Sequence, residues 1–263
     1  MLPQKRWTYL EADEDVVNEL QKQLNIHPVL CKLLVLRNIK TFEDAKDFFR
    51  PSLDKLHDPF LMKDMEIAIS RIETAIKNNE HILIYGDYDV DGTTAVSLVY
   101  SFFKEIYDKV AYYIPDRYTE GYGISFQGID FAADNNVTLI IALDCGIKAH
   151  DKVDYANEKG IDFIICDHHL PGDTLPNAVA ILDPKRNDCT YPFDELSGCG
   201  IGFKLIQAFA SKNNVLTEKI YEQLDLVAVS IASDLVPITG ENRILAKFGV
   251  DKVNTNPRAG FKA

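Results

Sequence analysis

The chain has 263 residues, of which 46% are hydrophobic and 26% are charged, and its formal net charge is −12. This composition supports a globular protein with a buried core, and the length suits one large domain or one domain with a smaller attachment. No uncharged apolar run of about 18 residues and no apolar N-terminal segment are present, so neither a membrane span nor a signal peptide is predicted.

The cysteine content indicates the redox environment. The five cysteines form no CxxC pair, and two of them lie in apolar runs typical of strands. We therefore predict free thiols and a reducing, cytoplasmic location. The cysteines are Cys31, Cys145, Cys166, Cys189 and Cys199.

The acidic balance counts against nucleic-acid binding, because proteins that bind nucleic acid usually carry a basic surface. Carboxylates that hold divalent cations weaken this objection, since the bound ions offset their charge. If this segment binds DNA, it therefore needs a local basic patch.

The first 63 residues are predicted to form a helical extension. Thr41 is a helix cap followed by acidic residues, and Pro51 ends that helix. Residues 64–78 then have apolar side chains at helical spacing and are predicted to form an amphipathic helix.

From residue 81 onward, short apolar runs alternate with helical patterns. The predicted strands are 81–86, 110–114, 138–143, 162–166 and 178–182. The predicted helices are 93–107, 125–135 and 150–159, followed by 200–211, 218–232 and 241–253. Strands that are apolar on both faces and separated by helices predict an α/β fold with a doubly wound parallel sheet. The main domain is expected to span 64–254, and 255–263 to begin a linker.

Acids and histidines recur where the predicted strands end. Because ligands of open parallel sheets bind beyond the carboxyl ends of the strands, these side chains should meet in one crevice. A further aspartate follows an apolar helix and is a candidate contributor. The residues are Asp87, Asp89, Asp91, Asp144, Asp167, His168, His169 and Asp234.

A cluster of this kind suits phosphodiester hydrolysis. Two divalent ions about 3.5–4 Å apart can bind the anionic phosphate oxygens, activate a water and stabilise the leaving oxygen. Holding two ions requires several carboxylates, and mixed aspartate and histidine ligands favour Mn²⁺ or Mg²⁺.

Each motif has a simpler interpretation. The DxDxDG pattern resembles part of a calcium loop, but the EF-hand pattern needs a glutamate at position 98, which is leucine here, and a preceding helix instead of a strand. Asp144 could cap the next helix, and His168 and His169 could be a surface pair. Their joint placement at strand ends favours the metal site.

The chain resembles the DHH phosphoesterase superfamily and, within it, the RecJ family of single-strand-specific 5′→3′ DNA exonucleases. The resemblance runs from about residue 27 to the end of the sequence. Six segments in the same order carry it: Tyr85–Gly92, Ile114–Gly123, Leu143–Gly146, Cys166–His169, Ser197–Leu205 and Ser233–Pro237.

The resemblance implies metal roles for the acidic cluster. Asp89 and Asp91 would bind different ions and Asp144 would bridge them, while Asp87 matches the first acid of the family's motif and is a further metal candidate. His168 and Asp234 would complete one ion's ligands. Some relatives have a histidine where this chain has Tyr85, so one ion would have fewer protein ligands.

The catalytic and substrate-binding roles follow in the same way. His169 would face the scissile phosphate, and Asp167 would orient the histidines. Arg117 would contact a phosphate, and Tyr122 would stack on a base. The backbone amides of Gly198 and Gly200 could receive a phosphate, although close helix packing explains these glycines equally well.

The implied function is metal-dependent hydrolysis of single-stranded DNA from its 5′ end to mononucleotides, in DNA repair or recombination. The implied partners are single-stranded DNA and a helicase or single-strand-binding protein, without a membrane. The alternatives are a phosphoesterase for short oligonucleotides or nucleotide phosphates, and a non-catalytic scaffold of the same fold. The RecJ family continues into further domains, so the sequence is expected to be a truncated form with weakened activity.

Overall fold

The computed structural model describes residues 6–263, and the chain forms two compact units that divide between Lys55 and Leu56. The predicted domain bounds at residues 63 and 254 remain predictions. His57 belongs to the larger unit, because its backbone N–H donates to Glu241 (2.9 Å) and its carbonyl accepts from Lys204 (2.9 Å). These hydrogen bonds hold the segment after Leu56 in the larger unit.

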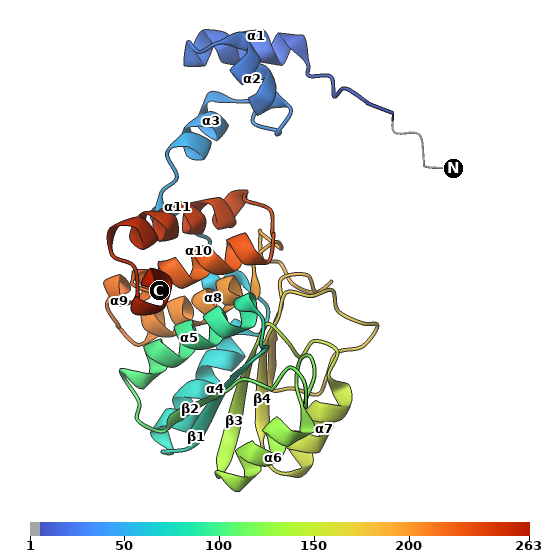
Figure 1. The fold of residues 1–263 in the computed structure, drawn as a ribbon, viewed down its shortest axis with the longest axis vertical. Coiled ribbons are helices and arrows are strands. Elements are labelled where there is room, and N and C mark those ends of the chain that lie inside the picture. Colours follow the sequence, from blue (N-terminus) through green and yellow to red (C-terminus); the bar gives the residue numbers. More distant parts are fainter. Residues whose placement is uncertain (1–5) are drawn as a thin grey trace. The chain divides into compact units, whose positions relative to one another are not determined.

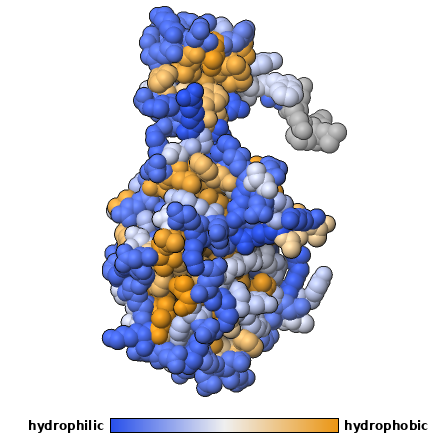
Figure 2. All heavy atoms as spheres, turned by 90° about the vertical axis from the view of Figure 1, so that its left-hand side faces the viewer, coloured by the Kyte–Doolittle hydropathy of each residue, from blue (hydrophilic) through white to orange (hydrophobic). Residues whose placement is uncertain are grey.

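The smaller unit contains three helices, α1 (Glu14–Leu24), α2 (Pro28–Val35) and α3 (Phe42–Phe49). Thr41 and Asp44 form a reciprocal capping box at the start of α3, which confirms the predicted cap. A buried cluster lies between the helices, and apolar side chains also gather on the surface of this unit (Figure 2).

The larger unit is built on a five-stranded, all-parallel sheet with the order β2-β1-β3-β4-β5. The central strands are buried on both faces, as their apolar sequences predict. The strands are β1 (His81–Gly86), β2 (Val110–Tyr113), β3 (Val137–Leu143), β4 (Asp162–Cys166) and β5 (Ala180–Leu182).

Helices cover both faces of this sheet (Figure 1). One face packs against α6 (Phe126–Asp134) and α7 (His150–Glu158). The other face is covered by α4 (Met65–Lys77), α5 (Val90–Lys104) and α8 (Gly198–Lys212). Outside them, α10 (Leu224–Ser233) packs against α5, α8 and α11 (Gly240–Thr255). The α/β class with a doubly wound parallel sheet is confirmed.

The prediction of one continuous helix over 218–232 is wrong. The segment forms α9 (Thr217–Tyr221) and α10, with a break at Glu222 and Gln223. The carbonyl of Glu222 accepts hydrogen bonds from Lys252 and Arg258. These partners lie about 30 residues or more away in the sequence, so local spacing could not reveal the break. The chain ends with a single turn, α12 (Ala259–Lys262).

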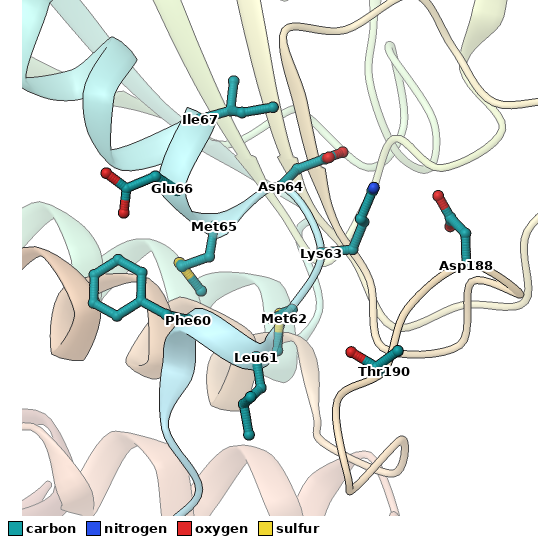
Figure 3. Close-up of a pocket in the computed structure, with 10 residues that line it drawn as sticks. All are labelled: Phe60, Leu61, Met62, Lys63, Asp64, Met65, Glu66, Ile67, Asp188 and Thr190. Carbon is teal, nitrogen blue, oxygen red and sulfur yellow. The ribbon is translucent and has the colours of Figure 1, made fainter.

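Two short 3₁₀ turns, Leu53–Lys55 and Pro59–Leu61, precede α4. A surface hollow of about 350 Å³ lies beside the second turn, between residues 60–67 and the side chains of Asp188 and Thr190 (Figure 3). None of the predicted site residues lines it. All five cysteines are free thiols, as predicted. No helix within residues 6–263 is long and apolar enough to cross a membrane.

Candidate metal centre

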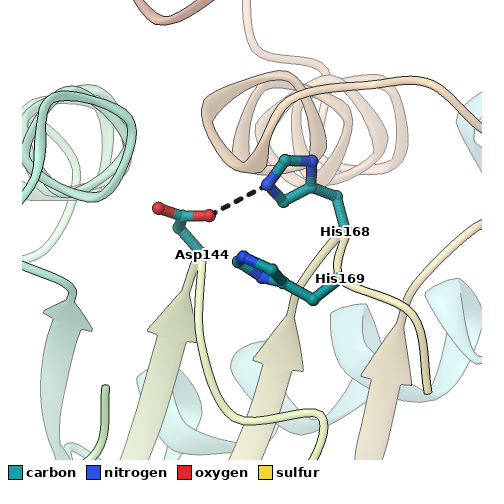
Figure 4. A group of neighbouring side chains, drawn as sticks. All are labelled: Asp144, His168 and His169. Carbon is teal, nitrogen blue, oxygen red and sulfur yellow. Dashed lines mark ion pairs between the residues drawn. The ribbon is translucent and has the colours of Figure 1, made fainter. Parts of the chain in front are cut away.

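Two overlapping groups of possible metal ligands lie at the carboxyl ends of β3 and β4. One contains Asp144, His168 and His169 (Figure 4), and the other contains Asp91, His168 and Asp234. Within each group the ligand atoms lie within 4.8 Å of one another. Because His168 belongs to both groups, the five side chains form one centre.

His168 occupies the middle of this centre. Its Nε2 lies 3.2 Å from Asp144 Oδ1, 3.6 Å from Asp234 Oδ2 and 3.7 Å from Asp91 Oδ2. The predicted convergence of strand ends therefore brings together residues from β3, β4, α5 and the end of α10.

Asp144 takes a strained backbone conformation directly after β3. Its φ of 59° lies in the left-handed region, which few residues other than glycine adopt. Its backbone N–H still donates to Cys166 O (2.8 Å), so it stays in register with β4. The turn places its carboxylate beside His168.

Three predicted ligands follow β1, and of these only Asp91, in the first turn of α5, belongs to one of the two groups described above. Asp89 caps α5 by accepting from Gly92 N (2.9 Å), and Asp87 accepts from Tyr88 N (2.7 Å). Gly92 is required here, because a Cβ atom would lie 2.5 Å from Asp87 O. The metal roles of Asp87 and Asp89 remain predictions.

Asp167 holds His169 in place. Its Oδ1 accepts from His169 Nδ1 (2.7 Å) and from the backbone N–H groups of His168 and His169, while Oδ2 accepts from Ile147 N (2.9 Å). Burial alone would raise the pKa of Asp167, but the hydrogen bonds and charge of His169 hold it below the usual value. The same hydrogen bond raises the pKa of His169. Because Nδ1 is bonded to Asp167, Nε2 is the ring nitrogen of His169 that remains for other contacts.

The electrostatics of the centre fit a bound cation. Both carboxylate oxygens of Asp144 and both ring nitrogens of His168 are buried without a hydrogen-bond partner among the described residues. Burial raises the pKa of Asp144 to about 10, and the nearby charges of Asp91 and Asp89 add to the shift. Buried ligand atoms without partners and close like charges are what a divalent cation would stabilise.

The loop 114–125 places Tyr122 beside the centre and Arg117 over the ring of Tyr88. The Arg117 guanidinium lies over the ring of Tyr88, 4.7 Å from its centroid. Tyr122 packs edge-on against the same ring (5.8 Å between centroids), and its hydroxyl lies 3.5 Å from His169 Nε2. The substrate roles of Arg117 and Tyr122 remain predictions.

Tyr85 is buried and anchors this loop through its hydroxyl group. Its hydroxyl donates to Gly123 O (3.0 Å) and accepts from Ser125 N (3.0 Å). Glu120 completes the anchor by accepting from Tyr113 and Ser125. Tyr85 therefore stabilises this loop through its hydroxyl group.

The structure gives the amides of Gly198 and Gly200 protein partners in place of the predicted phosphate. Gly198 N donates to Asp91 Oδ2 (2.7 Å), and Gly200 N donates to Ser197 Oγ (3.1 Å). A Cβ atom on Gly198 would lie 2.6 Å from Asp144 Cβ. The close-packing interpretation therefore explains Gly198.

Sequence reasoning missed a buried acid next to the centre. Asp183 follows β5, is fully buried, and has one carboxylate oxygen without a partner among the described residues. Burial raises its pKa to about 7. Its position directly after a buried strand was the available signal, as for the other acids.

We expect Asp183→Asn to stabilise the metal-free protein in a pH-dependent way. Below about pH 4 the carboxyl is protonated in both states. Between about pH 4 and 7 only the unfolded chain releases the proton, so the folded state loses stability, by about 4 kcal/mol at most above pH 7. Thermal unfolding in EDTA should show little difference from wild type at pH 4 and a higher Tm of the variant at pH 7.5. An equal difference at both pH values would contradict the assignment.

The fold and the centre together define a class: an α/β domain with a buried carboxylate and histidine centre at the carboxyl edge of a parallel sheet. Residues 81–231 match the N-terminal domain of the DHH family, which is more than half of the chain. The chain therefore belongs to the DHH family, and Asp167, His168 and His169 are its namesake motif.

Individual relatives give a more specific comparison. The chain is 42% identical to the single-stranded-DNA-specific exonuclease RecJ of Bacillus subtilis, over 98% of this chain and 32% of that protein. It is 32% identical to RecJ of Escherichia coli, over 90% of this chain and 42% of that protein. The chain thus spans about one third of the first relative and about two fifths of the second.

Two solved structures of RecJ proteins have a fold similar to that of this chain. A crystal structure of exonuclease RecJ bound to manganese matches 76% of this chain and 51% of that chain, with 28% identity and a TM-score of 0.69. RecJ of Thermus thermophilus in complex with Mn²⁺ matches 95% of this chain and 35% of that chain, with a TM-score of 0.78. At 24% identity, the second match supports the fold alone.

Proposed function

We propose that this chain is the catalytic part of a metal-dependent nuclease that hydrolyses single-stranded DNA from its 5′ end to mononucleotides. The observation that carries the proposal is the buried centre around His168, in a chain that aligns over 98% of its length with a RecJ exonuclease. The 5′ polarity rests on the family resemblance alone.

The ligand set fits Mn²⁺ or Mg²⁺, because carboxylate oxygens and imidazole suit these ions and no thiolate faces the centre in the two groups described. Asp91, His168 and Asp234 would hold one ion, and Asp144 and His169 lie beside this group. Asp87 and Asp89 are further candidate metal ligands. Bound ions would supply Lewis-acid stabilisation of the phosphate and of the attacking water.

The surrounding side chains would orient the substrate. His169 is fixed through Nδ1 by Asp167, so its Nε2 can hold a proton toward a phosphate oxygen. Its raised pKa favours the protonated form. Arg117 and Tyr122 would receive the phosphate and base of the terminal nucleotide.

The test is an assay of 5′-labelled single-stranded DNA with Mn²⁺, with Mg²⁺ and with EDTA. Release of labelled mononucleotide only in the presence of metal is expected. Activity that persists in EDTA would refute the proposal. Faster turnover of dinucleotides than of long strands would instead favour the short-oligonucleotide phosphoesterase, and metal binding without hydrolysis would favour the scaffold.

We further propose a cytoplasmic location, supported by five free thiols, and a partner that exposes single strands, such as a helicase or single-strand-binding protein. A substrate that must be single-stranded requires such a supply from duplex DNA. Stimulation of digestion of duplex DNA by an added helicase would support this, and an unchanged rate would argue against it.

Arg117→Ala is expected to raise KM for 5′-phosphorylated single-stranded DNA about tenfold, since a charge-assisted hydrogen bond contributes about 1.5–3 kcal/mol and this side chain is exposed. The salt dependence of binding should lose about one unit of slope. Steady-state kinetics and binding at several salt concentrations measure both. Arg37→Ala in the smaller unit is the control, and an unchanged KM for Arg117→Ala would remove Arg117 from the substrate site.

A further inference from the structure

The carboxylate of Asp91 accepts hydrogen bonds from three protein groups before any ion binds. Oδ1 accepts from Cys199 N (2.8 Å) and from Ser230 Oγ (2.7 Å), and Oδ2 accepts from Gly198 N (2.7 Å) and faces His168. Two of these donors are the first backbone N–H groups of α8, whose helix dipole favours an anion there. Asp91 is thus oriented by contacts outside the centre itself.

A bound cation sets the hydrogen-bond directions around Ser230. As the ligand of a cation Asp91 is ionised and can only accept, so the single hydroxyl proton of Ser230 is donated to it. Ser230 Oγ must then accept from Ser197 Oγ (2.6 Å), and Ser197 Oγ in turn accepts from Gly200 N (3.1 Å). Ser197, Ser230 and Asp91 are all buried. The chain of donors therefore has one direction, toward Asp91.

This arrangement selects the oxygen that Asp91 presents to the centre. A carboxylate oxygen has two lone pairs, and both on Oδ1 are occupied by Cys199 N and Ser230 Oγ. Oδ2 has one partner and lies 3.7 Å from His168 Nε2, so it keeps one lone pair for an ion. Ser230 and Asp234 are one turn apart at the end of α10, so this helix end supports one ligand and supplies another.

We propose that Ser230 is a positioning residue that fixes Asp91 as a single-oxygen ligand and thereby sets the affinity of the Asp91, His168 and Asp234 group for a divalent cation. The proposal rests on the metal dependence in the proposed function, but not on cleavage of DNA. Residues that orient a metal ligand typically change metal affinity by about 10- to 100-fold when they are removed.

The experiment measures Mn²⁺ binding to the whole chain without DNA. The electron paramagnetic resonance signal of free Mn²⁺ reports how much of the ion remains unbound. Ser230→Ala is expected to weaken one bound ion by about 10- to 100-fold. Ser230→Cys keeps the volume with a much weaker donor, so it should behave like Ser230→Ala. Ser97→Ala is the control, because it removes a serine hydroxyl on α5 that donates to the backbone carbonyl of Thr93.

Circular dichroism establishes that the variants are folded. Wild-type affinity in Ser230→Ala would overturn the inference, and so would wild-type affinity in Ser230→Cys, since packing alone would then explain the serine. Weakened binding in both variants of a chain that does not cleave DNA would support Ser230 and refute the nuclease. If both variants bind Mn²⁺ with wild-type affinity and the chain cleaves DNA, the role of Ser230 is refuted and the nuclease proposal is supported. A wild-type chain that takes up no Mn²⁺ would refute both.

Discussion

Asp144→Ala is expected to lose metal-dependent cleavage of single-stranded DNA almost completely. Removal of a residue that merely orients a ligand costs about 10- to 100-fold in affinity or activity, so loss of the carboxylate that lies 3.2 Å from His168 Nε2 should exceed 100-fold. Rates of mononucleotide release by wild type and variant, at saturating Mn²⁺, measure the effect.

Two further variants make this result specific. Asp144→Asn preserves the volume and removes the charge, so it should be nearly as inactive while tolerating the metal-free state better, because the buried carboxylate has a strongly raised pKa. Asp134→Ala, an exposed aspartate at the end of α6, should retain wild-type activity. Substantial cleavage by Asp144→Ala would place the chemistry elsewhere.

Gly198→Ala is expected to lower activity by about 10- to 100-fold without unfolding the protein, the range typical of disturbing a ligand's support. The added Cβ would lie 2.6 Å from Asp144 Cβ and 2.8 Å from its Oδ1, so Asp144 must move relative to His168. Single-turnover cleavage rates and Mn²⁺ titration would detect the displacement as a weaker, slower enzyme.

Gly200→Ala is the matched control, because it lies in the same turn of α8 and its Cβ would meet nothing closer than 3.4 Å. Replacing a helical glycine by alanine should even stabilise the protein by about 0.5–1 kcal/mol. Equal activity losses in the two variants would show that helix α8 as a whole, and not the contact with Asp144, is sensitive.

The sequence predicted most of the sheet because the signal is local. A strand that is apolar on both faces, such as 162–166, has one structural explanation, and its bounds are confirmed. The break at Glu222 was not predictable in this way, because it depends on hydrogen bonds that Lys252 in α11 and Arg258 donate to the carbonyl of Glu222. The unit boundary after Lys55 likewise depends on Lys204 and Glu241, which lie far away in sequence.

The sequence by itself determined which residues could form the centre. Parallel strands end at one edge, so acids and histidines placed after them must converge, and Asp144, His168 and Asp91 do. The tertiary structure alone decided how they are held. The amides of Gly198 and Gly200 serve Asp91 and Ser197, and Ser230 reaches Asp91 across 139 residues. Such hydrogen bonds depend on the packing of α5, α8 and α10, which no spacing within one segment encodes.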